Sequence, residues 1–227
     1  NAQLQKKALM QQLLTGKKRL KDENGERFSG EWAFNKLENL CHINPGKKAN
    51  NESTVVSFIP MDAVSEDAKI LYLLEKTYLE VEKGFVSFTD NDVLIAKITP
   101  CFENGKGCLA KNLKNSIGFG STEFHVLRAK KTISPEYLYY LTNTREFRSK
   151  GEANMQGSAG QKRVPTNYLK NLTIYFPKDI AEQNKISATL STLDNIINQN
   201  KTKILFLKNE KKSLMQQLLT GKRRVKI

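Results

Sequence analysis

The sequence predicts an α+β protein in which a mixed α/β domain is followed by a long coiled-coil-like helix. Short segments rich in Val, Ile, Phe and Tyr alternate with Gly and Asn turns between residues 31 and 177. After residue 181 the apolar residues recur at alternating steps of four and three, which is the spacing of a heptad repeat. The hydrophobic content of 39% is sufficient for a packed core in a chain of 227 residues.

The two ends of the chain share one sequence. Residues 6–19 match residues 211–224 at an offset of 205. The two differences are Ala8 against Ser213 and Lys18 against Arg223. This period is the size of a domain, whereas solenoid repeats have periods of roughly 20 to 50 residues. We therefore expect one full turn of a domain-sized unit, with the tail of a preceding unit still attached.

Six strands are expected in the middle of the chain, because β-branched and aromatic residues gather there between turn residues. They span residues 54–59, 85–88, 92–98, 107–109, 123–129 and 172–176. Asn104 and Gly105 predict a hairpin turn between two of these strands. Ser134 followed by Pro135 predicts the start of a helix that continues to Phe147.

The last part of the chain predicts one continuous helix, because neither Pro nor Gly occurs between Pro177 and Gly221. Gly221 suits the left-handed cap at its end. The residues predicted to pair with another helix, here called the pairing stripe, are Ile186, Leu190, Leu193, Ile197, Asn200, Ile204, Leu207, Leu214 and Leu218, with Lys211 as a second polar member.

Such a stripe needs a partner helix, either from a preceding part of a longer polypeptide or from a second copy of the chain. Asn200 is predicted to be either a register-fixing polar contact or an exposed position on the helix. The stripe therefore predicts association without deciding its source.

The net charge of +14 is unevenly distributed along the chain. Residues 31–92 carry 6 basic and 11 acidic groups, residues 93–177 carry 13 and 5, and residues 201–227 carry 9 and 1. A one-sided basic excess attracts phosphate groups. The second half of the globular region and the end of the long helix are therefore candidate nucleic-acid surfaces.

Composition also excludes several classes of protein. No segment approaches the roughly 20 apolar residues of a membrane span or resembles a signal peptide, so no membrane association is expected. The three cysteines, Cys41, Cys101 and Cys108, lack a CxxC pair, which favours reduced thiols in a cytoplasmic protein.

Few residues are suited to catalysis. The two histidines, His42 and His125, do not stand at metal-ligand spacing from a cysteine or from each other, and no nucleotide-binding Gly-rich motif is present, so neither a metal nor a cofactor is expected. Asp62, Asp67 and Lys69 faintly suggest a metal-dependent nuclease. Two alternatives to a non-catalytic DNA-binding protein stay open. One is a self-contained DNA-modifying or DNA-cleaving enzyme, and the other is a coiled-coil adaptor that binds protein or RNA.

The segment NMQGSAGQKR, residues 154–163, predicts a loop that contacts DNA. Its glycines permit close backbone approach, its amide and guanidinium groups match adenine and guanine edges, and its lysine can hold a phosphate, as can Arg148 and Lys150 before it. A second candidate surface follows Gly118. The candidate DNA-binding residues are Lys97, Lys106, Ser121, Thr122, Gln156, Ser158, Gln161, Lys162 and Arg163.

Several segments, taken in order, resemble the specificity (S) subunit of Type I restriction-modification enzymes. They are the LLTGK end of the terminal helix, DVLIAK at 92–97, GSAGQKRVP at 157–165, and IYFP at 174–177 followed by EQ at 182–183. The resemblance covers essentially the whole chain. It corresponds to the second half of such a subunit, with one target-recognition domain where the full pattern has two.

The resemblance implies a domain organisation and a function. Residues 1–21 would be the end of a preceding conserved helix, 22–178 a target-recognition domain, 179–222 a long conserved helix for dimerisation and spacing, and 223–227 a basic tail. The implied function is recognition of a specific double-stranded DNA sequence without catalysis. Separate methyltransferase (modification) and restriction subunits would be the partners, together with a second copy in an antiparallel homodimer when the chain is a half subunit.

Overall fold

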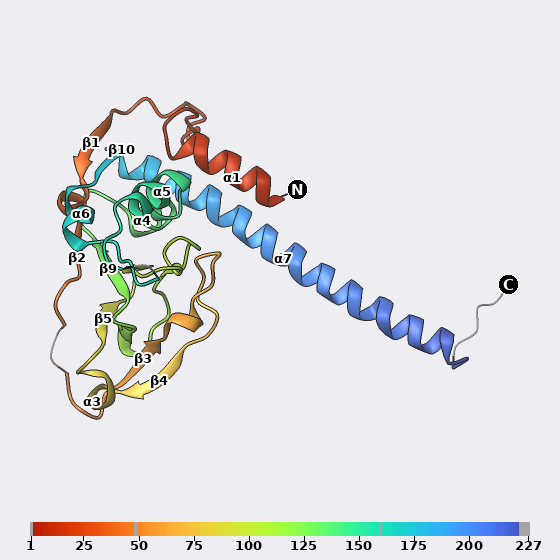
Figure 1. Cartoon of the computed structure of the whole chain (residues 1–227). Coiled ribbons are helices and arrows are strands. Elements are labelled where there is room, and N and C mark those ends of the chain that lie inside the picture. The colour runs from red at the N-terminus through yellow and green to blue at the C-terminus, as the bar shows by residue number, and fades with distance from the viewer. Residues whose placement is uncertain (1, 48–49, 159, 223–227) are drawn as a thin grey trace.

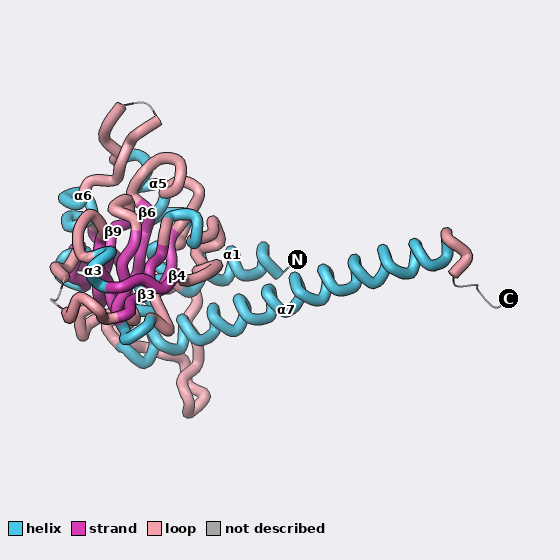
Figure 2. Tube along the Cα trace, turned by 90° about the horizontal axis from the view of Figure 1, so that it is seen from below, coloured by secondary structure: helices cyan, strands magenta, loops and turns pink. Residues whose placement is uncertain are grey.

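A computed structural model describes residues 2–47, 50–158 and 160–222 (Figure 1). It consists of a globular domain from which the helix α7 (Ile180–Leu219) projects. The helix α1 (Ala2–Leu13) lies beside the first half of α7, with the opposite chain direction (Figure 2). No helix in the described part of the chain is both long and apolar enough to cross a membrane.

The domain contains three sheets. The first has the antiparallel order β2 (Cys41–Ile43), β9 (Phe124–Ala129), β6 (Val93–Ala96) and β7 (Gly107–Leu109). The second has the order β4 (Leu74–Thr77), β3 (Val55–Ile59), β8 (Ile117–Gly120) and β5 (Val86–Thr89), in which β3 and β8 are parallel. The third is an antiparallel pair of β1 (Trp32–Lys36) and β10 (Thr173–Pro177).

Short helices connect these strands. They are α2 (Leu37–Leu40), α3 (Tyr78–Val81), α4 (Pro135–Thr142), α5 (Arg145–Ala153) and α6 (Thr166–Asn171), with single 3-10 turns at Met61–Ala63 and Lys114–Ser116. Of these, α4 packs directly against α7 and places it over the first sheet.

The core has layers because β6 is covered on both faces. Val93 and Ile95 belong to the cluster shared with α1, α4 and α7, whereas Leu94 between them belongs to the cluster between the first and second sheets. Successive side chains of a strand point to opposite faces, so a strand buried on both sides has apolar residues throughout. The run Val-Leu-Ile-Ala is accordingly buried at every position.

Each of the six predicted strands overlaps an observed strand, and the α+β class is confirmed. β1, β2, β4 and β8 were not predicted. β8 is rich in glycine, which is typical of turns, but its glycines give space to Phe88: a Cβ on Gly118 would lie 2.0 Å from the Phe88 ring. Close packing therefore explains glycine inside this strand.

The hairpin predicted from Asn104 and Gly105 is confirmed, because β6 and β7 are antiparallel neighbours. Its connection, residues 97–106, is longer than a two-residue turn. This connection coils on itself, since the N–H of Phe102 donates to the carbonyl of Ile98 at 3.0 Å and that of Asn104 to Pro100 at 3.0 Å. Gly105 closes the connection with a positive φ of 84°.

The helix predicted to run from Ser134 to Phe147 is two helices. Ser134 caps α4 as expected, because its side chain accepts from the N–H of Tyr137. α4 ends at Thr142, and Thr144 caps α5 by accepting from the N–H of Phe147 at 3.2 Å. Asn143 and Thr144 both bond to carbonyls of α4, and such side-chain bonds compete with helix continuation.

The long C-terminal helix is confirmed. Asp179 caps α7 by accepting from the N–H of Ala181, and Gly221 takes a left-handed φ of 71° after its end. The pairing stripe divides in two along this helix. Its members from Ile186 to Ile197 are buried or half-buried, and those from Asn200 onward are exposed except for the half-buried Leu214.

Candidate nucleic-acid interface

The predicted DNA-binding residues gather around the end of β6. Lys97 follows this strand, and its backbone N–H donates to the carbonyl of Glu123 at 2.8 Å in the turn between β8 and β9. On the other side the N–H of Val164 donates to the carbonyl of Lys97 at 2.9 Å. The end of β6 therefore holds two loops side by side, residues 121–123 and residues 154–163.

The longer loop is closed by its own backbone. Gln156 and Arg163 exchange two N–H···O bonds of 2.9 and 2.8 Å. Between them Gly157 and Gly160 adopt φ values of 126° and 81°, which glycine tolerates. Figure 2 shows this loop projecting from the domain beyond α5, to the side of the α7 axis. The exposed side chains of the loop include those of Gln156, Ser158, Gln161 and Lys162.

Arg163 joins the two loops. Its Nε donates to Oε2 of Glu123 at 3.0 Å and its Nη2 to Oε1 at 2.9 Å, while its Nη1 donates to the carbonyl of Gln161 at 3.1 Å. The bond from Arg163 is the main reason that the pKa of Glu123 is lowered, so the carboxylate stays ionised. In the free protein the guanidinium of Arg163 therefore holds the loop in place.

The other candidates surround the same strand end. Thr122 is the exposed member of the short loop, and the hydroxyl of Ser121 accepts from the N–H of Glu123 at 3.2 Å. Lys106 lies opposite Ala96 across the β6–β7 connection, and its Nζ donates to the carbonyl of Met61 at 3.1 Å. Lys106 is thus oriented by the domain before any ligand binds.

His125 anchors the end of the long loop from inside the domain. Its Nε2 lies 2.8 Å from the carbonyl oxygen of Val164, and its Nδ1 lies 3.2 Å from the amide nitrogen of Asn44. A neutral imidazole satisfies both contacts, since Nε2–H donates and Nδ1 accepts. Burial lowers the pKa of His125 below its usual 6.5, which favours this neutral form.

The prediction that Arg148 holds a phosphate is wrong. The side chain is buried, and its guanidinium donates to the carbonyls of Thr142 at 2.9 Å and Phe102 at 3.1 Å. Burial lowers its pKa to about 10. Arg148 therefore supports the β6–β7 connection from beneath. Lys150 is exposed, one helical turn from its ion-pair partner Glu146 at 2.7 Å.

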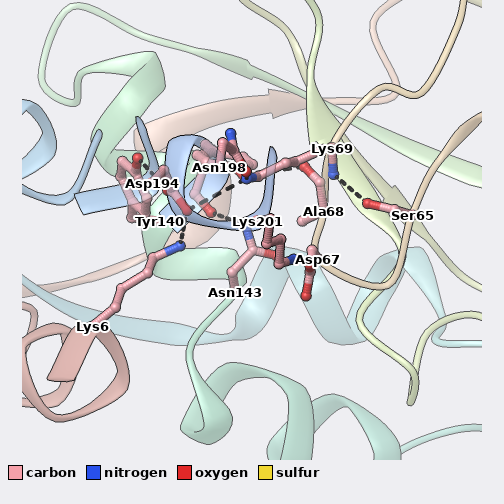
Figure 3. A network of polar contacts seen from close by, with 11 residues as sticks. Lys6, Ser65, Asp67, Ala68, Lys69, Tyr140, Asn143, Asp194, Asn198 and Lys201 are labelled. Carbon is pink, nitrogen blue, oxygen red and sulfur yellow. Dashed lines mark hydrogen bonds and ion pairs between the residues drawn. The ribbon is translucent and has the colours of Figure 1, made fainter. Parts of the chain in front are cut away.

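A second polar site joins the domain to both α7 and α1 (Figure 3). Asp194 on α7 accepts from Nζ of Lys6 at 2.7 Å and from the hydroxyl of Tyr140 at 2.9 Å, and Nζ of Lys69 lies 3.8 Å away. Burial, followed by the charge of Asp194, raises the pKa of Tyr140, so its hydroxyl stays protonated and donates. We call this group of four residues the Asp194 junction.

Further contacts reinforce the junction along α7. Lys69 donates to Oδ1 of Asn198 at 2.7 Å, and Lys201 donates to Oδ2 of Asp67 at 2.8 Å (Figure 3). Beyond Lys201 the described residues of α7 are exposed apart from the half-buried Leu214. The junction could not be predicted from sequence, because a charged residue next to the pairing stripe is ordinarily solvent-exposed.

The residues of the alternative catalytic site make structural contacts. Asp62 accepts from the hydroxyl of Tyr72 at 2.7 Å, while Asp67 and Lys69 contact α7 as described. In the part of the chain that the structure describes, no group of three His, Cys, Asp or Glu residues is placed to hold a metal ion. Burial raises the pKa of Cys41 and of Cys108 to about 12, so both thiols stay protonated.

Comparison with known proteins agrees with this architecture. Residues 29–214 match the family model described as Type I restriction modification DNA specificity domain. The chain is 35% identical over 200 residues to the Type I restriction enzyme EcoEI specificity subunit of Escherichia coli, covering 87% of this chain and 34% of that protein. It is 36% identical over 190 residues to the EcoAI specificity subunit of the same organism, covering 83% and 32%.

A solved structure shares the fold. The HsdS subunit from Thermoanaerobacter tengcongensis superposes with a TM-score of 0.62 and 22% identity, over 82% of this chain and 47% of that one. The chain thus spans about a third of the length of the two E. coli relatives and about half of this structure. Since the family model covers most of the chain, the predicted resemblance is confirmed, and the protein belongs to the family of Type I restriction modification DNA specificity domains.

Proposed function

We propose that this chain recognises a specific double-stranded DNA sequence as the specificity subunit, or half of one, of a Type I restriction-modification system. The observation that carries the proposal is the convergence of two loops at the end of β6. These loops present exposed amide, hydroxyl and ammonium groups within the segment of residues 93–177, which carries 13 basic and 5 acidic groups.

The side chains divide into two roles. Gln156 and Gln161 would contact base edges, because an amide offers a paired donor and acceptor that match adenine. Lys162 and Lys97 would hold phosphates and so fix the position of the domain on the duplex. Ser121, Thr122, Ser158 and Lys106 would add contacts at the edge of the same surface. Arg163 would reach a base only after releasing Glu123, so its primary role is to support the loop.

α7 would set the distance between two recognition domains. Its stripe from Ile204 to Leu218, exposed except for the half-buried Leu214, has the spacing of a helix face that packs on another helix. We infer an antiparallel partner, which is a second copy when the chain is a half subunit. Residues 22–178 would then form the recognition domain at each end, and residues 179–222 the spacer.

We infer that this chain supplies recognition, and that separate modification and restriction subunits carry out methylation and cleavage in the cytoplasm. The basic end of α7, with 9 basic groups and 1 acidic group in residues 201–227, is available to DNA between the two half-sites or to those subunits. Incubation of the chain alone with Mg²⁺ or with a methyl donor should give no product. Turnover would overturn this inference.

Selection of bound duplexes from a random pool tests the recognition proposal. A gapped consensus sequence is expected, with affinity that falls steeply as salt is raised. Gln161→Ala should cost about 1–3 kcal/mol on the selected duplex and little on a scrambled one. Lys162→Ala should weaken both duplexes alike and reduce the salt dependence by about one ion.

Lys83→Ala is the matched control, because Lys83 is exposed after α3 in the acidic part of the domain. It should leave both affinities unchanged. Equal losses on selected and scrambled duplexes for Gln156→Ala and Gln161→Ala would remove base reading from this loop. Absence of duplex affinity even at low salt would favour a protein or RNA adaptor.

A further inference from the structure

α1 packs on a face of α7, and the end of α7 repeats the sequence of α1. Lys6 contacts Asp194, and Arg19 after the helix contacts the fully buried carboxylate of Glu182, so residue numbers rise along α1 as they fall along α7. Between these polar contacts lies an apolar one, in which Met10, Leu13 and Leu14 share a core cluster with Ile186 and Leu190.

Every side chain that α1 uses here is repeated near the end of α7. Lys6, Met10, Leu13, Leu14 and Arg19 correspond to Lys211, Met215, Leu218, Leu219 and Arg224, with no change of residue type. Arg224 lies outside the described residues. The described apolar counterparts are exposed, with relative accessibilities of 50% at Met215, 44% at Leu218 and 83% at Leu219. The chain therefore contains a second, exposed segment with the side chains that pack on this helix face.

The Lys6–Asp194 contact gives a register for docking in trans, and the spacing of the pairing stripe is compatible with it. If Lys211 of a second copy replaced Lys6 beside Asp194, the two numbers would be equidistant from a point between residues 202 and 203. The pairing stripe is itself symmetric about residue 202. It matches Ile186 with Leu218, Leu190 with Leu214, Leu193 with Lys211, Ile197 with Leu207 and Asn200 with Ile204.

We propose that the α7 face formed by Ile186, Leu190 and Asp194 is a docking site for residues 211–222 of a second copy of this chain, and that α1 competes with that segment for it. The proposal rests on the helix pairing proposed above and adds the identity and exchange of the occupant. With α1 docked, the α7 helices of two copies can pair only through the middle of the pairing stripe. With α1 released, the whole stripe can pair.

Reciprocal charge swaps separate the two occupants. Asp194→Lys combined with Lys211→Glu restores an attractive contact in trans and makes Lys6 repulsive in cis. Asp194→Lys combined with Lys6→Glu does the opposite. The two double variants have the same composition and the same change at Asp194, so each is the control of the other.

Sedimentation velocity over a concentration series measures their association. We expect the Lys211→Glu pair to dimerise roughly thirtyfold more tightly than the Lys6→Glu pair, because each dimer contains the contact twice and each partly buried pair contributes about 1 kcal/mol. Equal dissociation constants would overturn the proposal, and so would the absence of association in both up to millimolar concentration.

Asp194 also contacts Tyr140, so both double variants could lose structure; the single variants Lys6→Glu and Lys211→Glu avoid this. Lys6→Glu should strengthen association by loosening α1, whereas Lys211→Glu should weaken it. Shifts in the same direction would overturn the proposal. Duplex binding by the same proteins distinguishes failure of this proposal from failure of the proposed DNA recognition. If the two single variants shift the dissociation constant of the dimer in opposite directions but no duplex binds, DNA recognition is excluded and the exchange stands. If duplexes bind but the dissociation constants do not shift in opposite directions, the exchange is excluded and DNA recognition stands.

Discussion

The two copies of the repeated segment have the same local structure in different surroundings. Gly16 and Gly221 both have a φ of 71°, and in each copy the preceding threonine hydroxyl bonds to the carbonyl four residues earlier. Leu13 is completely buried, whereas its counterpart Leu218 is 44% exposed. Short-range sequence therefore determines the helix and its cap, while burial depends on what lies opposite.

The comparison also separates two sources of helix stability. α1 is short and depends on packing against α7, as isolated helices of about 12 residues are marginal in water. The bare end of α7 is instead continuous with a packed helix. Substitutions in α1, after α1 and beside the middle of α7 test this difference.

Leu13→Ala should be far more damaging than Leu218→Ala. The first change leaves a cavity beside Ile186 and Leu190 and should lower the free energy of unfolding by about 2–5 kcal/mol. The second, at a half-exposed position, should cost less than about 1 kcal/mol. Urea unfolding at low protein concentration measures both. A comparable loss of unfolding free energy for Leu218→Ala would show that the repeated segment at the end of α7 is covered in solution.

Arg19→Ala should lower the free energy of unfolding by about 3 kcal/mol, because it leaves the buried carboxylate of Glu182 without its cation. The additional change Glu182→Gln should recover part of this loss. Arg27→Ala, at an exposed position in the following turn, is the control and should cost less than about 0.5 kcal/mol. Thermal unfolding of the three proteins provides the measurement. No recovery in the double variant would mean that packing of Arg19 on Trp32 dominates.

Asp67→Asn should have the smallest effect, a few tenths of a kcal/mol, because its ion pair with Lys201 is largely exposed. The bond from Lys201 is the main cause of a lowered pKa for Asp67. A carboxyl with a lowered folded-state pKa contributes stability above its ordinary value of 3.8 and loses it as the pH falls through the folded value.

Amide hydrogen exchange near Lys201 measures this effect. The variant should exchange faster than the unmodified chain at neutral pH, and identically once the pH has fallen through the lowered folded-state pKa of Asp67. Glu23→Gln, at an exposed position, removes one negative charge elsewhere and should change neither value. Faster exchange that persists at low pH would assign the effect to packing instead of charge.

The elements predicted from sequence are those with a strong local pattern. β6 is a continuous apolar run, and α7 combines a heptad spacing with a cap at each end. β8 was not predicted because its two glycines are explained by the ring of Phe88 and, at Gly120, by the carbonyl of Ile59, which come from other strands. A strand whose residue types depend on packing against a distant part of the chain cannot be predicted from its own sequence pattern.

The candidate site was located from composition, but the state of its side chains was not predictable. The loop of residues 154–163 was identified from its glycines, amides and basic groups. The partner that holds Arg163 is Glu123, 40 residues earlier in the chain, and only the sheet brings the two together. The burial of Arg148 was not predictable for the same reason, since its carbonyl partner Phe102 lies in a connection whose shape depends on the fold.

The closed base of the long loop has a consequence for how the protein can diversify. The exchange of bonds between Gln156 and Arg163, together with the attachment of Val164 to Lys97 and His125, fastens the loop on its inner side. Exposed side chains between the two ends can therefore be substituted while the backbone attachment of the loop is kept. If the loop reads DNA as proposed, a change of target preference is separated from the demands of folding.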